Sequence, residues 1–352
     1  MIKKQRTPPL KLLKLQALLR YLPPNHQKKP DVESQLAKFQ AGFRGEESID
    51  YHLNFLPEKE YVILHDIRLQ HRNSFFQIDS LILHSSFILI LEVKNIAGEI
   101  FVDPYFNQMK RSINGEIEVF PDPILQAYKQ SVELEKWLHH NHCPTAPIEY
   151  LVVLANHHTL ITNSPQDNKV HQRLVRSTAL PYRIMSFSTK HRGHQLSKKD
   201  LTKIEKRVMN HHVSLNKNVL EHFGISPFEL STGVYCLKCD TLSMERISGT
   251  WKCRLCSQEE KEAHILALKD YALLQNASIS NWEMRQYLNL DSKSIASKLL
   301  KQMNLPSTGS TRNRKYILTS LTGQPLFDDE KLKQSSSGKH SYQSQRTHKR
   351  IP

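Results

Sequence analysis

Apolar residues recur every three or four positions between residues 31 and 56, and this spacing predicts an amphipathic helix that ends before Pro57. The residues on its apolar face are Leu36, Phe39, Phe43, Ile49 and Leu53. Three runs rich in β-branched and aromatic residues follow at 61–69, 74–83 and 87–94, and these predict successive strands. The pattern therefore indicates a helix followed by a sheet.

A second helix and a buried strand continue this pattern. Residues 123–140 have apolar side chains at helical spacing and begin with proline, which is tolerated in the first turn because its missing N–H has no helical partner there. Residues 149–154 are almost wholly apolar, as expected of a strand buried on both faces. The whole predicts a mixed α/β domain.

Other segments have weaker patterns. We expect a pair of strands near Ile100 and at 116–120, with Asn114-Gly115 as the turn between them. Further along, strands are expected near 172–175 and 183–187. A helix is expected over residues 198–212, and the sequence leaves open whether these later elements extend the first domain.

The first 32 residues contain a basic, leucine-rich stretch that predicts a short helix followed by a linker. Pro23-Pro24 and Pro30 interrupt the pattern. We expect this helix to dock onto the protein's own core, although a role at a membrane surface is the alternative.

Four polar residues fall at matched depth in the hairpin of the second and third strands. If the chain turns at Ser85-Ser86, Asp79 lies opposite Glu92 and Gln77 lies opposite Lys94. Side chains alternate faces along a strand, so these four residues are expected to share one face. The residues expected on the other face are Phe76, Ile78, Leu91 and Val93.

These polar residues suit a metal site. Two carboxylates a strand apart repel one another unless a cation lies between them, and Asp79 and Glu92 offer the hard oxygen ligands that Mg²⁺ or Mn²⁺ prefers. A lysine beside such a metal, here Lys94, can orient a water and stabilise charge on a phosphate. An ordinary edge salt bridge is the alternative. This set of residues is also suited to phosphodiester hydrolysis.

The hairpin resembles the PD-(D/E)xK nuclease superfamily, with Asp79 as the first acid and Glu92-Val93-Lys94 as the ExK element. More closely, residues 38–155 resemble the nuclease-related domain called NERD. The motifs that carry this likeness are Gly42-Phe43-Arg44-Gly45-Glu46, Gln77-Ile78-Asp79, Glu92-Val93-Lys94-Asn95 followed by Gly98, and Gln126.

The resemblance implies a restriction-endonuclease-like α/β fold, with a mixed sheet flanked by helices, and a Mg²⁺-dependent nuclease core. It implies that Glu46 joins Asp79 and Glu92 at the metal. It also implies that Gln126 supports Lys94 or the phosphate. The neighbouring alternatives to Glu46 and Gln126 are Glu47 and Gln130.

Two Cys-x-x-Cys pairs, Cys236/Cys239 and Cys253/Cys256, are separated by thirteen residues. Each pair can place two thiolates on one metal, and the arm between them is long enough for a short hairpin. The spacing predicts a closed Cys₄ site for Zn²⁺, which makes this segment a structural zinc ribbon rather than a redox centre. Cys143 has no such pairing and is expected to be a buried or neutral cysteine.

Three helices are expected after the ribbon, at 261–275, at 281–288 with Ser280 as its cap, and in a third segment capped by Asp291. A strand-like run follows at 316–318, so this module resembles a winged helix-turn-helix. The residues expected to meet DNA are Ser292, Lys293, Ser294 and Lys298 on the last helix and Arg312, Arg314 and Lys315 in the wing. The alternative is a three-helix cap that binds nothing.

The distribution of charge changes this picture. The 352 residues carry a formal net charge of +15, of which residues 1–30 contribute +8 and residues 331–352 contribute +6. Residues 31–150 have a net charge of −8, whereas residues 151–330 have +9. The predicted nuclease core is therefore acidic, and attraction to phosphate must come from the two ends and the C-terminal half.

Composition excludes several classes of protein. A hydrophobic content of 39% with 24% charged residues is typical of a globular chain, and the longest apolar run, at 87–91, is far too short to span a membrane. The N-terminal stretch lacks the pattern of a secretory signal, and the paired cysteines fit a reducing compartment. We therefore expect a cytoplasmic protein.

The predicted organisation has six parts. They are a basic N-terminal segment and linker (1–32), a NERD nuclease-like domain (33–155), an α/β extension (156–230), a zinc ribbon (231–260), a winged-helix-like module (261–322) and a basic disordered tail (323–352). The predicted function is metal-dependent hydrolysis of phosphodiester bonds in nucleic acid, with DNA as the expected partner. The alternatives are a non-catalytic DNA-binding protein on a nuclease-like scaffold and an adaptor that binds protein through its ribbon.

Overall fold

The computed structural model describes residues 2–164, 167–193 and 195–323, except for the side chain of Arg312. Its contacts divide the chain into two units, one of Met1–Leu15 with Gln27–Leu215 and one of Gln16–His26 with Asn216–Pro352. Helix α1 (Leu10–Tyr21) contributes residues to both. The predicted disordered tail, from residue 324 onward, lies outside the described residues.

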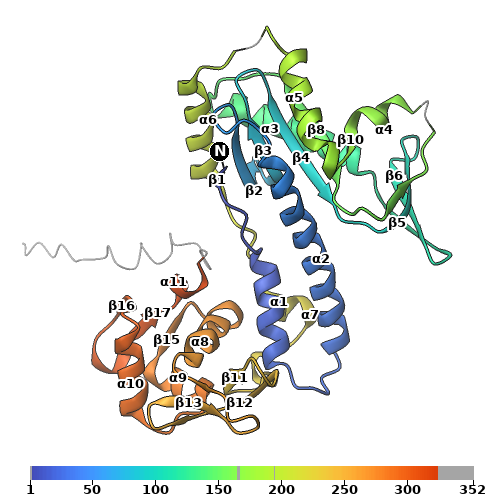
Figure 1. Cartoon of the computed structure of the whole chain (residues 1–352). Helices are drawn as coiled ribbons and strands as arrows, with labels where there is room; N and C mark the ends of the chain where they lie inside the picture. Colours follow the sequence, from blue (N-terminus) through green and yellow to red (C-terminus); the bar gives the residue numbers. More distant parts are fainter. Residues whose placement is uncertain (1, 165–166, 194, 324–352) are drawn as a thin grey trace, which may run out of the picture. The chain divides into compact units, whose positions relative to one another are not determined.

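The first unit is built on a six-stranded mixed sheet in the order β1-β2-β3-β4-β8-β10 (Figure 1). Strands β2, β3 and β4 are antiparallel neighbours, strands β4, β8 and β10 run parallel, and β1 lies parallel to β2. Their bounds are β1 (Ile2–Lys4), β2 (Val62–His71), β3 (Ser74–Leu83), β4 (Ile88–Lys94), β8 (Ile148–Leu154) and β10 (Leu174–Arg176). The three strands predicted after the first helix, and the buried strand, are confirmed.

Helices cover both faces of this sheet because both faces are apolar. The helices are α2 (Lys29–Leu53) and α5 (Leu180–Lys190) on one face, and α3 (Pro123–His140) and α6 (Lys198–His211) on the other. Leu89 and Leu91 of β4 pack beneath the first pair, whereas Ile88 and Ile90 pack beneath the second. Each fully buried side chain of this kind contributes roughly 1.5–3 kcal/mol. The predicted α/β class, a mixed sheet flanked by helices, is confirmed.

The strand expected at 183–187 is wrong, because these residues lie inside α5. Leu180, Ile184 and Phe187 are buried at helical spacing, and Pro181 stands in the first turn. A run of five residues is too short for its periodicity to distinguish a strand from a helix. The neighbouring prediction at 172–175 is correct only in part, since helix α4 (Asn168–Arg173) and the 3₁₀ turn η1 (Ser177–Ala179) bracket β10.

A smaller sheet of the first unit has the strand order β7-β6-β5-β9. Its strands are β5 (Gly98–Asp103), β6 (Gln108–Ile113), β7 (Glu116–Pro121) and β9 (Thr159–Ile161). The predicted turn is confirmed, with φ of 52° at Asn114 and 84° at Gly115, the positive values that a tight hairpin turn requires. The turn joins β6 to β7, and the sequence pattern did not reveal β6.

The second unit contains two small antiparallel sheets. The first is β11 (Val234–Cys236), β12 (Thr241–Ile247), β13 (Thr250–Cys253) and β14 (Glu259–Glu260), and the second has the order β15 (Ser278–Ser280), β17 (Lys315–Ile317), β16 (Ser307–Thr308). The helical segments are α7 (Val219–Phe223), η2 (Pro227–Glu229), α8 (Ala263–Leu274), α9 (Asn281–Leu288), α10 (Lys293–Gln302), η3 (Thr311–Asn313) and α11 (Thr319–Thr322).

The three predicted C-terminal helices are confirmed as α8, α9 and α10, with one correction at a cap. Ser280 caps α9 in a reciprocal capping box with Glu283. The cap of α10 is Ser292 rather than Asp291, because the Ser292 hydroxyl accepts a hydrogen bond from the N–H of Ile295. In the part of the chain that the structure describes, no helix combines the length and apolar character needed to cross a bilayer.

Candidate active site and cysteine cluster

The β3–β4 hairpin pairs in the register predicted from the sequence. Ser80 lies opposite Leu91, and Leu83 lies opposite Ile88. The chain turns at Ser85-Ser86, as the pairing requires. Asp79 and Glu92 are the first residues beyond the last pair, so both leave the ladder at the same depth.

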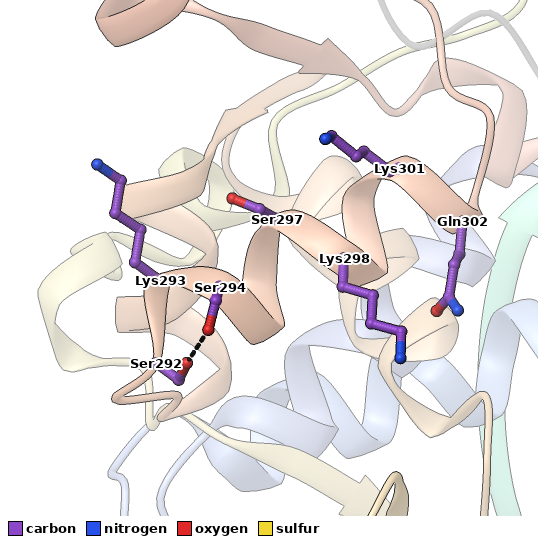
Figure 2. Close-up of a pocket in the computed structure, with 7 residues that line it drawn as sticks. All are labelled: Ser292, Lys293, Ser294, Ser297, Lys298, Lys301 and Gln302. Atoms are coloured by element: carbon purple, nitrogen blue, oxygen red, sulfur yellow. Dashed lines mark hydrogen bonds between the residues drawn. The ribbon is translucent and has the colours of Figure 1, made fainter.

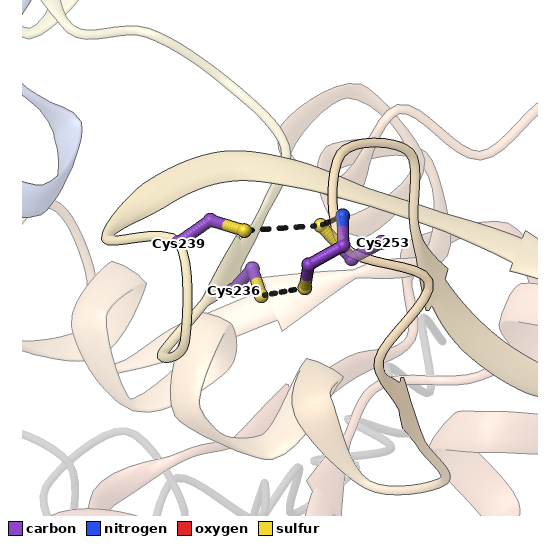
Figure 3. Close-up of side chains that lie close together, drawn as sticks. Cys236, Cys239 and Cys253 are labelled. Atoms are coloured by element: carbon purple, nitrogen blue, oxygen red, sulfur yellow. Dashed lines mark hydrogen bonds between the residues drawn. The ribbon is translucent and has the colours of Figure 1, made fainter.

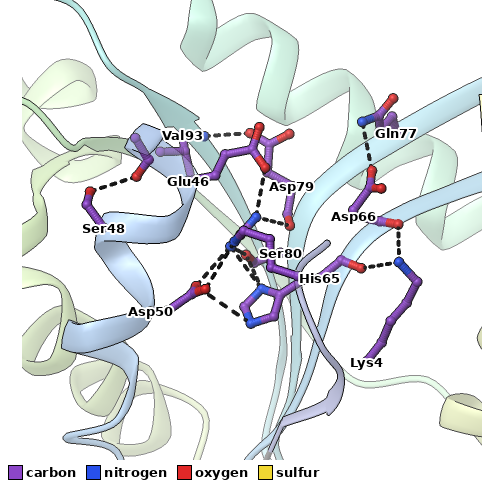
Figure 4. Close-up of polar contacts among 12 residues, drawn as sticks. Lys4, Glu46, Ser48, Asp50, His65, Asp66, Gln77, Asp79, Ser80 and Val93 are labelled. Atoms are coloured by element: carbon purple, nitrogen blue, oxygen red, sulfur yellow. Dashed lines mark hydrogen bonds and ion pairs between the residues drawn. The ribbon is translucent and has the colours of Figure 1, made fainter. Parts of the chain in front are cut away.

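Beyond this ladder the two strands separate, and Asp79 lies at the point of separation. One of its carboxylate oxygens accepts a hydrogen bond from the N–H of Val93 at 2.8 Å (Figure 4). The side chain therefore takes the place of the carbonyl group that would continue the ladder. The predicted opposition of Gln77 and Lys94 is wrong, because the separated strands no longer pair there. Gln77 instead donates a hydrogen bond to Asp66 at 3.0 Å.

The same irregularity changes which face β3 presents. Phe76 and Ile78 pack in the core cluster beneath α3, whereas Leu91 and Val93 pack in the cluster beneath α2. The prediction that these four residues share one face is therefore wrong. The change coincides with a gap in the β2–β3 ladder, where Asp66 of β2, with a φ of 48°, falls opposite Asp79. A local break of this kind shifts the alternation of side chains by one residue.

Glu92 of β4 is buried and accepts three side-chain hydrogen bonds. Lys94 Nζ and Gln126 Nε2 each lie 2.7 Å from its Oε1, and Gln130 Nε2 lies 2.7 Å from its Oε2. Gln126 and Gln130 are one turn apart on α3, and Gln126 also accepts a hydrogen bond from Lys94 at 3.2 Å. Both glutamines that the sequence offered as alternatives therefore contact Glu92.

Glu46 reaches the site from α2, and a glycine lets this helix approach the end of β4. A Cβ atom on Gly45 would lie 2.4 Å from the Cβ of Asn95, which directly follows β4. Asn95 also donates a hydrogen bond to the carbonyl of Ala41 in the same helix at 2.7 Å. Glu46 is partly buried, whereas Glu47 is exposed. The helix therefore presents Glu46 to the site rather than its neighbour.

Two acids of the cluster, Asp79 and Glu46, have a raised pKa. Burial raises the pKa of Asp79 well above its usual value, and the charges of Glu92 and Glu46 raise it further. Burial also raises the pKa of Glu46 to about 7, although Arg6 acts in the opposite direction. A cation placed among such carboxyl groups strongly stabilises their ionised form.

The donor set fits a divalent metal ion. The acidic side chains of the cluster are Glu46, Asp50, Asp79 and Glu92, and the basic ones are Arg6 and Lys94. When all four acids are ionised, the negative charges exceed the positive ones by two, and a divalent ion would balance them. Mg²⁺ commonly takes only one or two protein carboxylates and keeps several waters. The carboxylates do not form a closed cage. Among the described residues, the group of three or more His, Cys, Asp or Glu side chains with all ligand atoms within 4.8 Å of one another consists of the four cysteines.

One cation of this cluster is not among the predicted site residues. Arg6 belongs to the basic N-terminal segment, yet its side chain is 3% exposed and donates hydrogen bonds to Glu46 at 2.8 Å and to Asp50 at 3.0 Å. No local pattern marks it, because its partners lie forty or more residues further along the chain.

The four cysteines of the second unit come together, as their spacing predicts (Figure 3). The Sγ atoms of Cys236 and Cys256 are 3.8 Å apart, as are those of Cys239 and Cys253. A disulfide would need about 2.05 Å. Four thiolates around a tetrahedral ion with Zn–S bonds of about 2.3 Å lie about 3.8 Å from one another. The cluster can therefore hold zinc, with its ligands at the ends of β11 and β13 and on the turns that follow these strands.

The outer face of α10 is polar and basic. The residues that line a shallow, open hollow there are Ser292, Lys293, Ser294, Ser297, Lys298, Lys301 and Gln302 (Figure 2). Of the predicted wing residues, Arg314 is exposed and Lys315 makes an ion pair with Glu283 at 3.5 Å. The side chain of Arg312 lies outside the described residues.

The sheet, its flanking helices and the polar cluster where β3 and β4 part define a nuclease-like α/β fold. The comparison with protein families agrees, since residues 41–155 match the model described as NERD, nuclease-related domain. The match covers about a third of the chain. Comparisons with curated proteins and with solved structures gave no match. The chain thus carries a nuclease-related domain, which contains Glu46, Asp79, Glu92, Lys94 and Gln126.

Proposed function

We propose that the first unit is a divalent-metal-dependent nuclease that hydrolyses phosphodiester bonds in DNA. The observation that carries the proposal is the convergence of Asp79, Glu92 and Lys94 where β3 and β4 separate, inside the nuclease-related stretch. The likeness of these residues to the PD-(D/E)xK pattern supports the same reaction.

In this proposal each residue of the cluster has a distinct task. Asp79 and Glu92 hold the metal ion, and Glu46 joins directly or through a water. Bound Mg²⁺ or Mn²⁺ would polarise the phosphate and make a water more acidic. Lys94 is held by Glu92 and Gln126, from where its ammonium group orients the attacking water and stabilises charge on the phosphate.

The second unit would bring the nucleic acid. Its order of helix, strand, two helices and two strands, from α8 to β17, supports a winged helix with α10 as the recognition helix. Lys293 and Lys298 are exposed on that helix, where they can contact phosphates. We propose that the cysteine cluster holds a structural Zn²⁺. Its thiols must then be reduced, which supports a cytoplasmic location as part of the proposal.

The test is metal binding and cleavage measured together on the same variants. Asp79→Asn should abolish saturable Mn²⁺ binding, and Lys94→Ala should slow cleavage by about 10²–10³-fold while leaving the metal bound. Glu47→Gln is the matched control, because it removes an exposed carboxylate from the same helix as Glu46. A panel of single- and double-stranded DNA and RNA should be tried with Mg²⁺ and with Mn²⁺. Full cleavage by Asp79→Asn would contradict the proposed roles.

One observation favours a second candidate, a DNA-binding protein that uses the nuclease fold only as a scaffold. The carboxylates do not gather as closely as the four cysteines do, among the described residues. Such a protein would bind DNA through the second unit, and it would show no Mn²⁺ site that depends on Asp79. Mn²⁺ titration of the wild type and of Asp79→Asn therefore separates the two candidates before any substrate is known.

A further inference from the structure

Arg6 is a buried cation that contacts helix α2, which carries Glu46, and strand β3, which carries Asp79. Its guanidinium group donates hydrogen bonds to Glu46 Oε2 at 2.8 Å and to both carboxylate oxygens of Asp50 at 3.0 and 3.2 Å. It also donates to the Ser80 hydroxyl at 3.0 Å and to the main-chain carbonyl of Asp79 at 3.4 Å. Arg6 therefore links helix α2 to strand β3.

The segment before Arg6 holds it in place. Strand β1 pairs with β2 at the sheet edge, with Ile2 beside Ile63. Lys4 donates hydrogen bonds to the carbonyls of His65 and Asp66 at 2.8 and 2.9 Å, at the break in the β2–β3 ladder. Lys4 thus gives both carbonyls a hydrogen-bond partner where the backbone is irregular. The N-terminal strand thus fixes the position from which Arg6 enters the site.

His65 supports the same arrangement from β2. Its Nδ1 lies 2.9 Å from the Arg6 guanidinium and 2.9 Å from the Ser80 hydroxyl. Because a guanidinium group can only donate, Nδ1 must accept and is unprotonated. A neutral imidazole is consistent with its setting, since burial and the charge of Arg6 lower the pKa of His65 to about 4.

Burial decides what kind of role Arg6 can have. With only 3% of its side chain exposed, it cannot reach a phosphate in solution. It occupies one oxygen of Glu46 and leaves the other free. An arginine fork is suited to this task, because its several donors have fixed directions and can hold several acceptors at once.

We infer that Arg6 is a positioning residue, which sets the separation between Glu46 and Asp79 that a divalent metal ion requires. This inference rests on the proposed function. It adds that the site is completed by a residue outside the stretch that matches the nuclease-related domain. The alternative is that Arg6 competes with the metal for Glu46, in which case its removal would tighten metal binding.

The test measures Mn²⁺ binding by the full chain with Arg6→Gln, using electron paramagnetic resonance to count free and bound ion. Loss of an outer partner of a metal ligand typically weakens metal affinity by roughly 10- to 100-fold, and we expect a loss of that size. Lys3→Gln is the matched control, because it removes one positive charge from an exposed position of the same segment. It should bind Mn²⁺ as the wild type does.

Arg6→Lys keeps the inference testable if Arg6→Gln does not fold. Lysine preserves the charge but cannot bridge Glu46, Asp50 and Ser80 together, so we expect affinity between those of the wild type and Arg6→Gln, with an altered spectrum of the bound ion. Wild-type affinity in folded Arg6→Lys, or unchanged or tighter binding in Arg6→Gln, would overturn the inference. Asp79→Asn separates the two failures: if it too leaves binding unchanged, the proposed metal site is wrong, and if it alone abolishes binding, only the role of Arg6 is wrong.

Discussion

The two candidate metal centres of this chain are assembled in opposite ways. The four cysteines lie between residues 236 and 256, on a hairpin and its flanking turns. The acidic cluster draws on five separate parts of the first unit, namely the N-terminal segment, α2, β3, β4 and α3. A site whose ligands lie close together in the chain can therefore be recognised from the sequence. A site whose residues come from several strands and helices becomes complete only when the sheet is folded.

The largest effect should follow from removing metal from the cysteine cluster. Structural zinc contributes roughly 10–16 kcal/mol of apparent binding energy in small zinc modules, so Cys253→Ser or strong chelation should unfold β11–β13. Zinc content and hydrogen exchange of this hairpin check the outcome. Cys143→Ser is the control, since Cys143 is buried in the first unit and should leave zinc content unchanged.

Mn²⁺ binding by the acidic cluster should survive the same treatment in Cys253→Ser. If it were abolished, the two centres would depend on one another and the contrast between a local and an assembled site would fail.

A smaller effect should come from the close approach of α2 to β4. Gly45→Ala adds a Cβ atom 2.4 Å from Asn95, and overpacking of this kind costs about 1–3 kcal/mol of unfolding free energy. It should also weaken Mn²⁺ binding, because Glu46 is the next residue. Hydrogen exchange of the first unit over a series of denaturant concentrations measures the loss of stability.

Gly42→Ala is a matched control on the same helix, where an added Cβ would meet no atom within 4 Å. It should raise stability by about 0.5–1 kcal/mol, because alanine favours helix more than glycine does. Equal effects of the two substitutions would show that the contact with Asn95 does not constrain the helix.

The smallest effect should be a change in the salt dependence of DNA binding. Replacing both Lys293 and Lys298 by Gln should weaken binding and flatten the slope of log K against log salt by about 0.9 for each phosphate that the variant no longer neutralises. Fluorescence anisotropy at several salt concentrations measures the slope. The control replaces Lys198 and Lys199, two exposed lysines at the start of α6 in the first unit, and an equal change there would remove the special role of α10.

Much of the fold could be predicted because its signals are local. Helix α3 begins at Pro123 and ends at His140 as expected, and the Asn114-Gly115 turn and the β3–β4 register follow from side-chain periodicity and turn chemistry. Short elements were harder, since α5 was mistaken in part for a strand and β6 was missed. These elements are too short for the spacing of their apolar residues to distinguish a helix from a strand.

The acidic site was predictable only as a set of residue types. The sequence, with its resemblance to a nuclease family, pointed to Asp79, Glu92 and Lys94, and offered Gln126 and Gln130 as alternatives, although both contact Glu92. It did not reveal that β3 changes face beside the site. That change coincides with the irregular backbone of Asp66 in the neighbouring strand, which strict period-two alternation along β3 does not include.

The sequence by itself determined the α/β class, the register of the hairpin and the grouping of four cysteines, because each rests on contacts between residues close in the chain. Only the tertiary structure brought Arg6 to Glu46 and Asp79, and α2 to Asn95. Such contacts depend on how helices and strands pack over a whole sheet. A basic residue in an N-terminal segment has the same local pattern whether it faces solvent or, as here, lies buried among carboxylates.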